Sequence, residues 1–384
     1  MVIGAYYPEL SGGGLPCREI VRRLRDRARF TVLTTTAHQT SDGEDAQDGV
    51  PVIRVYVDPA NRRSKLRAIA RMAAAFWRER RRFSIVHLHG FSQKSILMVA
   101  LARLLGKRLV ITLTSVGHDD PVSMKQRGTM TYWAYSRADV FAAVSPGFRP
   151  LYESSSLPPD RLKYIPNAVD TERFAPVSAD RRRALRRELG LPEDGSIVLF
   201  VGFFSREKGP DRAFEAFARV SGAFPRAHLV MIGATRSAYY EVDADLADAI
   251  KHRIHERHLE GRVTFVESTL EIHKYFQAAD VYLLTSTREG LPVALLEAMS
   301  TGLGCVATRL DGITDVLLTD HVSGLLVEPL DIDGFEASLR LMLGNDDSRQ
   351  AMGVRARHVV ERGFGVETMV ESYFRSYLDL TPDS

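Results

Sequence analysis

Short apolar runs alternate with stretches of helical pattern along almost the whole chain of 384 residues. Parallel strands need long crossover connections, usually helices, and strands buried on both faces are nearly continuous apolar runs. The alternation therefore predicts an α/β fold with parallel sheets and crossover helices. The expected strands cover residues 30–34, 85–88, 109–113 and 140–144 in the first half, and 197–201, 228–232, 263–266, 281–284 and 305–308 in the second.

The length of the chain predicts two domains, because single hydrophobic cores stop growing beyond about 250–300 residues. Each half has its own set of expected strands and is interpreted as its own doubly wound unit. Residues 170–196 contain two prolines and a charged helical stretch at 180–189, and they are the expected linker region. We expect an N-terminal domain over residues 1–172, a C-terminal domain over 173–365, and a terminal helix within 366–384.

Two glutamates, Glu289 and Glu297, flank a Gly-Leu-Pro turn and an apolar helical run. The apolar run that precedes them ends in polar residues, so Glu289 is expected at the carboxyl end of a buried strand. Open α/β sheets bind ligands at such strand ends. Gly290, Leu291 and Pro292 lead into the helix, whose first backbone N–H groups suit a phosphate. Glu297, inside the helix, is expected to accept hydrogen bonds from a sugar hydroxyl.

The charge of the chain is unevenly distributed. Residues 1–170 hold 26 Lys and Arg against 15 Asp and Glu, a net +11, whereas the remainder holds 25 against 33, a net −8. Residues 62–82 contribute many of these cations, which surround an apolar stripe at helical spacing. Such a helix either packs its stripe on a sheet with a solvated basic face, or lies on an anionic membrane surface. The stripe consists of Leu66, Ile69, Ala73, Phe76 and Trp77.

Cysteine usage and the N-terminal sequence bear on the compartment. Cys17 and Cys305 are far apart and fit no disulfide or metal spacing, which favours a reducing compartment. The first residues lack the pattern of a signal peptide, and the most apolar stretch, 95–105, is too short to span a bilayer. We expect a cytoplasmic protein, or one that is peripheral at the inner face of the membrane. No nucleic-acid-binding motif is present, so a nucleic-acid partner is not expected.

The segment from Glu289 to Glu297 resembles the Glu-x7-Glu signature of the retaining glycosyltransferases of family 4. Further blocks resemble that family's pattern in the same order, from about residue 6 to about residue 330. They are a first glycine loop at 7–14, two inter-domain segments at 138–145 and 165–170, a phosphate-binding loop at 201–209, and a late strand at 324–329.

This resemblance implies the GT-B fold, in which two Rossmann-like, doubly wound domains face each other across a cleft. It implies acceptor binding by the N-terminal domain and nucleotide-sugar binding by the C-terminal domain. It also implies that the last helix, at about 367–378, crosses back to pack on the first domain.

Roles for individual residues follow from the same resemblance. Lys208, on the phosphate-binding loop with Gly202, holds the position of the family's lysine, which stabilises the departing diphosphate. Glu297 is implied as the ribose anchor and Glu289 as a contact to the hydroxyls of the donor sugar. The other expected donor-binding residues are Gly13, Gly14, Gly290, Leu291 and Pro292.

The chain departs from the family's pattern at Phe203, where an arginine is usual. Arg206 is expected either to replace that cation or to face solvent. His118 lies one or two positions from the family's usual histidine, and it is expected to contact donor or acceptor, with Asp119 as a rival. No Asp-x-Asp pair follows an expected strand, so no metal and no cofactor other than the UDP- or GDP-linked co-substrate is expected.

The expected activity is the transfer of a hexose, with retention and without a metal, to a glycan or lipid-linked acceptor. Such an enzyme would serve the biosynthesis of surface polysaccharide or glycolipid. A nucleotide-sugar epimerase of GT-B fold and a catalytically silent sugar-nucleotide-binding subunit remain alternatives. The oligomeric state is left open by the sequence.

Overall fold

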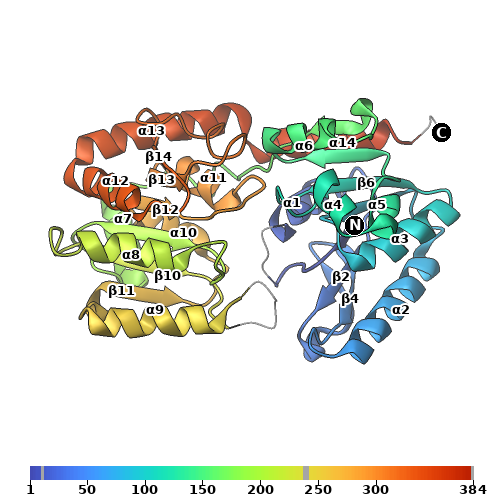
Figure 1. The fold of residues 1–384 in the computed structure, drawn as a ribbon, viewed down its shortest axis with the longest axis horizontal. Helices are drawn as coiled ribbons and strands as arrows, with labels where there is room; N and C mark the ends of the chain where they lie inside the picture. Colours follow the sequence, from blue (N-terminus) through green and yellow to red (C-terminus); the bar gives the residue numbers. More distant parts are fainter. Residues whose placement is uncertain (10–12, 237–241, 382–384) are drawn as a thin grey trace. The chain divides into compact units, whose positions relative to one another are not determined.

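The computed structural model describes residues 1–9, 13–236 and 242–381, which form two compact units (Figure 1). Unit 1 consists of Met1–Asn167 and Val366–Ser384, and unit 2 is Ala168–Gly365. The chain thus passes from one unit to the other just after Asn167, slightly before the expected junction at 172/173. The terminal helix belongs to unit 1.

Unit 1 is built on an eight-stranded sheet in the order β3-β4-β2-β1-β5-β6-β7-β8. Its strands pair in parallel except for β3 and β4, which form an antiparallel hairpin at one edge. The turn of this hairpin is Asp48-Gly49, and both residues have positive φ, as two-residue hairpins require. The strands are β1 (Val2–Ile3), β2 (Val32–Thr36), β3 (Gly43–Gln47), β4 (Val50–Tyr56), β5 (Ile85–His89), β6 (Arg108–Leu113), β7 (Val140–Ala143) and β8 (Leu162–Tyr164).

Helices cover this sheet, and the last of them comes from the C-terminus. They are α1 (Gly14–Leu24), α2 (Arg62–Glu79), α3 (Gln93–Leu104), α4 (Pro121–Gln126), α5 (Thr129–Tyr135), α6 (Arg149–Glu153) and α14 (Val366–Leu378). Helix α14 packs against α1, and buried polar contacts join it to β5 and β6. The His87 ring bonds to Tyr377 Oη at 2.7 Å and to Thr112 Oγ1 at 2.7 Å, and Tyr373 Oη lies 3.0 Å from the same Oγ1.

Helix α2 forms where its pattern predicts it, but its apolar stripe does not lie on a single face. Phe76 is buried in the core with Met72, whereas Leu66 and Trp77 are 69% and 46% exposed. The guanidinium of Arg80 lies 4.7 Å from the centre of the Trp77 ring. One side of the stripe, with Phe76, therefore packs in the core, whereas the other side, with Leu66 and Trp77, faces solvent.

Unit 2 contains a six-stranded, wholly parallel sheet in the order β11-β10-β9-β12-β13-β14. Its strands are β9 (Ile197–Val201), β10 (His228–Ile232), β11 (Val263–Val266), β12 (Val281–Leu284), β13 (Gly304–Thr308) and β14 (Leu325–Val327). Its helices are α7 (Ala179–Glu188), α8 (Pro210–Val220), α9 (Ala244–Glu256), α10 (Ile272–Ala278), α11 (Val293–Ser300), α12 (Ile332–Gly344) and α13 (Asp346–Gly363). Buried strands with helices on both faces are the arrangement that the apolar runs predict.

The expectation of a linker at 170–196 is wrong, because helix α7 in this segment is an integral part of unit 2. Arg186 is only 4% exposed and donates to Asp280 Oδ2 at 2.7 Å and to the carbonyl oxygen of Ala278 at 2.9 Å. Arg182 reaches the other oxygen of the same carboxylate at 3.1 Å. Two of the arginines that marked the segment as a linker thus pair with Asp280 and anchor α7 in unit 2.

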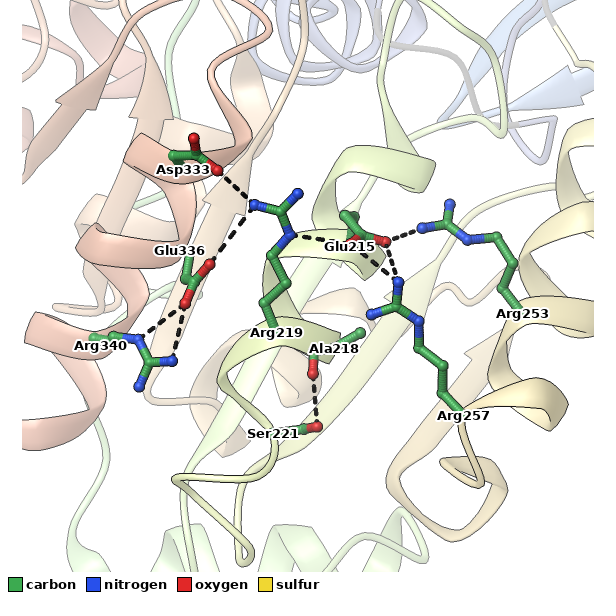
Figure 2. Close-up of polar contacts among 9 residues, drawn as sticks. All are labelled: Glu215, Ala218, Arg219, Ser221, Arg253, Arg257, Asp333, Glu336 and Arg340. Atoms are coloured by element: carbon green, nitrogen blue, oxygen red, sulfur yellow. Dashed lines mark hydrogen bonds and ion pairs between the residues drawn. The ribbon is translucent and has the colours of Figure 1, made fainter.

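Ion pairs join three outer helices of unit 2 around Glu215 of α8 (Figure 2). Its side chain is 16% exposed, and its Oε1 accepts from Arg219 Nε at 3.1 Å and from Arg257 Nη2 at 3.1 Å. Arg253 of α9 contacts the other carboxylate oxygen. Arg219 also forms an ion pair with Asp333 of α12, in which its Nη1 lies 2.5 Å from Asp333 Oδ1. Glu215 therefore pairs with three guanidinium groups, of which that of Arg219 also pairs with Asp333 and Glu336.

Glu215→Gln should lower the free energy of unfolding by about 1–2 kcal/mol, because Arg253 and Arg257 lose their counter-charge and Arg219 loses one of its carboxylate partners. Glu336→Gln is the matched control, since Glu336 pairs with Arg340 and Arg219 at the more exposed rim of the same network. We expect a change of roughly 0–1 kcal/mol there. Urea denaturation midpoints measure both variants, and equal midpoints would contradict the central role of Glu215.

Candidate active site

The topology of unit 2 places two loops together at the carboxyl edge of its sheet. From β9 the chain builds β10 and β11 on one side, and it then returns to β12 and builds β13 and β14 on the other. The neighbouring strands β9 and β12 are therefore the point where the strand order reverses, which is where doubly wound sheets bind ligands. Lys208 lies on the loop after β9, and Glu289 lies on the loop after β12.

The structure joins these two predicted residues directly. Lys208 Nζ donates to Glu289 Oε1 at 2.7 Å, and the two side chains are 30% and 10% exposed. Thr285 fastens the two loops to each other, because its Oγ1 donates to the carbonyl oxygens of Lys208 at 3.1 Å and Gly209 at 2.7 Å. A cation and a carboxylate are thus held side by side at the point where the strand order reverses, which we call the switch point.

Glycines shape the loop that carries Lys208. Gly209 has φ +68°, in the left-handed region that favours glycine, and it is the N-cap of α8. A Cβ at Gly202 would approach Phe200 Cζ at 3.3 Å and Lys208 Cβ at 3.5 Å. A side chain at position 202 would therefore press on the Phe200 ring, whereas its distance to Lys208 is an ordinary van der Waals contact.

Glu297 lies on α11 and is 7% exposed. Burial raises the pKa of its carboxyl to about 8, and the charge of Arg173 opposes that shift. No described side chain donates a hydrogen bond to its carboxyl oxygens. Tyr282 of β12 is fully buried, its hydroxyl has no partner among the described residues, and its pKa is raised by burial and then by the charges of Glu289 and Glu297.

Tyr282 and Arg173 are additions that the sequence alone did not single out. Tyr282 is part of an apolar strand pattern, and nothing in that pattern distinguishes a tyrosine that borders two carboxylates. Arg173 donates to the carbonyl oxygen of Leu270 at 2.9 Å, so it acts on Glu297 only through its charge.

The Gly-Leu-Pro turn connects Glu289 to the helix that carries Glu297. Gly290, Leu291 and Pro292 are all buried, and Pro292 is the N-cap of α11. Its carbonyl oxygen accepts from the backbone N–H of Leu295 at 3.1 Å, which closes the first turn. The buried turn fixes the separation of the two glutamates.

Arg206 does not join the Lys208 and Glu289 pair. Its side chain is 85% exposed, and its Nε lies 3.3 Å from Asp243 Oδ2 at the start of α9. Asp243 is the N-cap of that helix, where it accepts from the backbone N–H of Leu246 at 3.2 Å. Across the described residues, no group of three or more His, Cys, Asp or Glu side chains is placed to hold a metal ion.

The remaining predicted residues lie in unit 1. Asp119 is fully buried and accepts from the backbone N–H groups of Thr114 and Ser115 at 3.0–3.1 Å and 2.9 Å. Burial raises the pKa of its carboxyl, and these bonds oppose the shift. Asp119 therefore holds the loop after β6, and His118 beside it is partly exposed.

The first glycine loop is described only in part. Gly13 is the N-cap of α1 and Gly14 is its first residue, so both lie beyond the carboxyl end of β1. A Cβ at Gly13 would meet no atom of the described residues within 4 Å. Residues 10–12, which include the first of the three consecutive glycines, lie outside the described residues.

Two family models together match most of the chain. The model described as "Glycosyl transferase 4-like domain" matches residues 11–168, and the model described as "Glycosyl transferases group 1" matches residues 181–359. The second contains Lys208, Glu289 and Glu297. The chain belongs to glycosyltransferase family 4. The assignment inferred from the Glu-x7-Glu spacing and its companion blocks is confirmed.

The names of the curated relatives of this glycosyltransferase describe different reactions. "UDP-Gal:alpha-D-GlcNAc-diphosphoundecaprenol alpha-1,3-galactosyltransferase" of Escherichia coli is 28% identical over 225 residues, which cover 58% of this chain and 55% of that protein. "N-acetyl-alpha-D-glucosaminyl L-malate synthase" of Bacillus anthracis is 26% identical over 309 residues, which cover 79% and 77%. The match to the galactosyltransferase thus spans little more than half of that relative's length.

Solved structures confirm the GT-B fold class of this glycosyltransferase. HepE of Anabaena in complex with UDP-glucose superimposes with a TM-score of 0.79 at 17% identity, covering 98% of this chain and 99% of that one. Sucrose-phosphate synthase of Thermosynechococcus elongatus gives a TM-score of 0.81 at 21% identity, covering 99% and 98%. At these identities the likeness establishes the fold alone.

Proposed function

We propose that this glycosyltransferase moves a hexose from a UDP- or GDP-linked sugar to a glycan or lipid-linked acceptor, with retention at the anomeric carbon. The observation that carries the proposal is the Lys208 and Glu289 pair at the switch point of unit 2, near the buried and uncommitted carboxyl of Glu297. The relatives' names agree with it, since they include a galactosyltransferase that acts on a lipid-linked acceptor. The biosynthesis of surface polysaccharide or glycolipid is the proposed context.

The chemistry assigns a different task to each of the three residues. Glu297 accepts hydrogen bonds from the ribose hydroxyls, and Glu289 does so from hydroxyls of the donor sugar. Lys208 stabilises the diphosphate, which gains negative charge as the bond from the anomeric carbon to its oxygen breaks. The acceptor hydroxyl attacks the same face and passes its proton to the leaving phosphate. No protein nucleophile is then needed, in contrast to retaining glycosidases.

The release of nucleoside diphosphate from a panel of UDP- and GDP-sugars tests this function. Stoichiometric release with a new glycoside supports transfer. An interconverted donor without release would indicate epimerisation, and binding without any turnover would indicate a silent subunit. Either of these two results would overturn the proposal.

We also propose that the transfer needs no metal ion, with Lys208 as the cation that faces the diphosphate. The rate of diphosphate release should then stay the same in excess chelator and after added Mg²⁺ or Mn²⁺. Abolished release in chelator, restored by either ion, would contradict this part of the proposal.

Unit 1 offers a surface suited to an anionic membrane, where a lipid-linked acceptor would lie. Helix α2 packs on α3, and α3 packs on α5. Between α3 and α5 lies a hollow of about 570 Å³ lined by Arg103, Trp133, Ser136, Arg137 and Arg161. None of the described helices is long and apolar enough to cross a membrane. The exposed apolar side chains of this layer are Leu66 and Trp77 of α2, Leu104 of α3, and Met130 and Trp133 of α5.

Vesicle sedimentation tests this peripheral location at the cytoplasmic face. We expect binding to anionic but not to neutral vesicles, and loss of binding at high salt, because each cation near an anionic leaflet contributes about 1 kcal/mol within a Debye length. Reversing the charges of the exposed Arg62, Arg63 and Arg67 should weaken binding at least tenfold. A protein that stays in the supernatant with anionic vesicles at low salt would contradict this location.

A further inference from the structure

Lys94 occupies an unusual position at the carboxyl edge of the sheet of unit 1. It is the second residue of α3, and its Nζ lies 3.1 Å from Thr35 Oγ1 and 3.4 Å from the carbonyl oxygen of Ile3. Both partners are neutral, and no carboxylate of the described residues lies within ion-pair distance of the ammonium. Desolvation, without any charge that opposes it, lowers the pKa of Lys94 to about 8. The Lys94 side chain is half-buried, and its ammonium lacks a carboxylate partner among the described residues.

The N-termini of two helices, which carry partial positive charge, lie at the same edge of the sheet. Helix α1 begins after β1, and α3 begins after the neighbouring strand β5, so the N-termini of both helices point their partial positive charge at this edge. The carboxylates of the surrounding loops are engaged elsewhere. Glu9 accepts from Thr36 Oγ1, and Asp119 is held by Thr114 and Ser115. These two carboxylates thus accept hydrogen bonds from neutral groups of their own loops, and no charge of a described residue contributes to the lowered pKa of Lys94.

There is also room for a ligand beside this ammonium. Thr35 Oγ1, which Lys94 contacts, donates to the carbonyl oxygen of Gly4 at 2.6 Å. Gly4 is exposed, and a Cβ built on it would meet no atom of the described residues within 4 Å. The top of β1 is therefore open to solvent next to Lys94.

We propose that Lys94 binds a phosphoryl group of the acceptor, so that the enzyme selects acceptors that carry phosphate near the hydroxyl to be glycosylated. The inference rests on the proposed transfer function and names its acceptor class. A phosphoryl group supplies the missing counter-charge and several strong acceptor oxygens. A lipid-linked phosphate and a soluble phosphate ester would present the same group to Lys94.

Calorimetric titration with two probes, inorganic pyrophosphate and dodecyl phosphate below its micellar concentration, tests the inference. Saturating UDP or GDP, whichever binds, occupies the nucleotide site so that the probes report on unit 1. Lys94→Gln should raise the dissociation constant of the bound probe at least tenfold, and Lys94→Arg should keep most of the affinity. Lys125→Gln is the matched control, because it removes the same charge from an exposed lysine of α4.

A second measurement on the unaltered protein does not depend on the folding of a variant. Amine acetylation followed by mass spectrometry should show that the bound probe slows modification of Lys94 several-fold and leaves that of Lys125 unchanged. Lys94-dependent binding of pyrophosphate supports a soluble acceptor, and such binding of dodecyl phosphate alone supports a lipid-linked one. Nucleotide binding without Lys94-dependent binding of either probe would overturn this inference and leave the transfer proposal intact, whereas absent nucleotide binding would overturn the transfer proposal.

Discussion

Lys208→Ala should lower kcat by about 10²–10³-fold, which is the loss typical when one preorganised group that stabilises developing charge is removed. The ammonium is held 2.7 Å from Glu289 at the switch point, and its charge matters most when the diphosphate departs. The KM for the donor should change much less, because interactions that strengthen in the transition state appear in kcat. Steady-state kinetics of diphosphate release measure both constants.

Two comparison variants sharpen this result. Lys208→Arg keeps the charge and should retain more activity than the alanine variant, although its planar group does not match the lysine geometry. Arg206→Ala should cause a smaller loss, since that side chain is exposed and pairs with Asp243. An effect of Lys208→Ala on KM alone, with kcat unchanged, would reduce Lys208 to a binding residue.

Glu297→Ala should weaken nucleotide binding about tenfold or more, because removing one partner of a buried hydrogen bond costs about 1–3 kcal/mol. The carboxyl has no protein donor among the described residues, so its hydrogen-bonding capacity is available to the ribose. Calorimetric titration of UDP and GDP measures the change. Wild-type nucleotide affinity in this variant would remove Glu297 from the site.

The Glu297→Gln variant controls for folding. Its stability relative to the wild type should also depend on pH, with a sign that follows from the pKa of Glu297. The folded state raises the pKa of Glu297 to about 8, from an ordinary value of 4.5, so it retains a proton that the unfolded chain releases. Stability contributed by this group is complete below about pH 4.5 and falls as pH rises towards about 8. The glutamine variant should therefore melt at a higher temperature than the wild type at pH 8 and at the same temperature at pH 4. An equal difference at both values would contradict the shifted pKa.

The sequence predicts unit 2 better than unit 1, and burial explains the difference. Strands β9, β10, β11 and β12 begin and end at the expected residues, because strands covered on both faces are continuous apolar runs. The hairpin of β3 and β4 was not predicted, since β3 is a polar edge strand whose partner alone defines it. Helix α7 was misassigned to a linker, because the buried ion pair that anchors it joins Arg186 to Asp280, which lies 94 residues further along the chain.

In the candidate site, too, features within one segment could be predicted from the sequence, whereas contacts between distant segments could not. The spacing of Glu289 and Glu297 is local, and so is the glycine loop around Lys208. The contact between Lys208 and Glu289 joins residues 81 positions apart and depends on the strand order. The neutral surroundings of Lys94 likewise arise from β1 and β2, which no local pattern near residue 94 reveals.

The anomeric outcome of the reaction tests the central claim most directly. Proton NMR can follow a UDP- or GDP-sugar, its released diphosphate and the new glycoside in one sample, with Lys208→Ala as the comparison. The account predicts one equivalent of diphosphate for each glycoside formed, a product with the anomeric configuration of the donor, and a rate reduced at least a hundredfold in the variant. A product of inverted configuration, or a rate that is unaffected by the loss of Lys208, would contradict it.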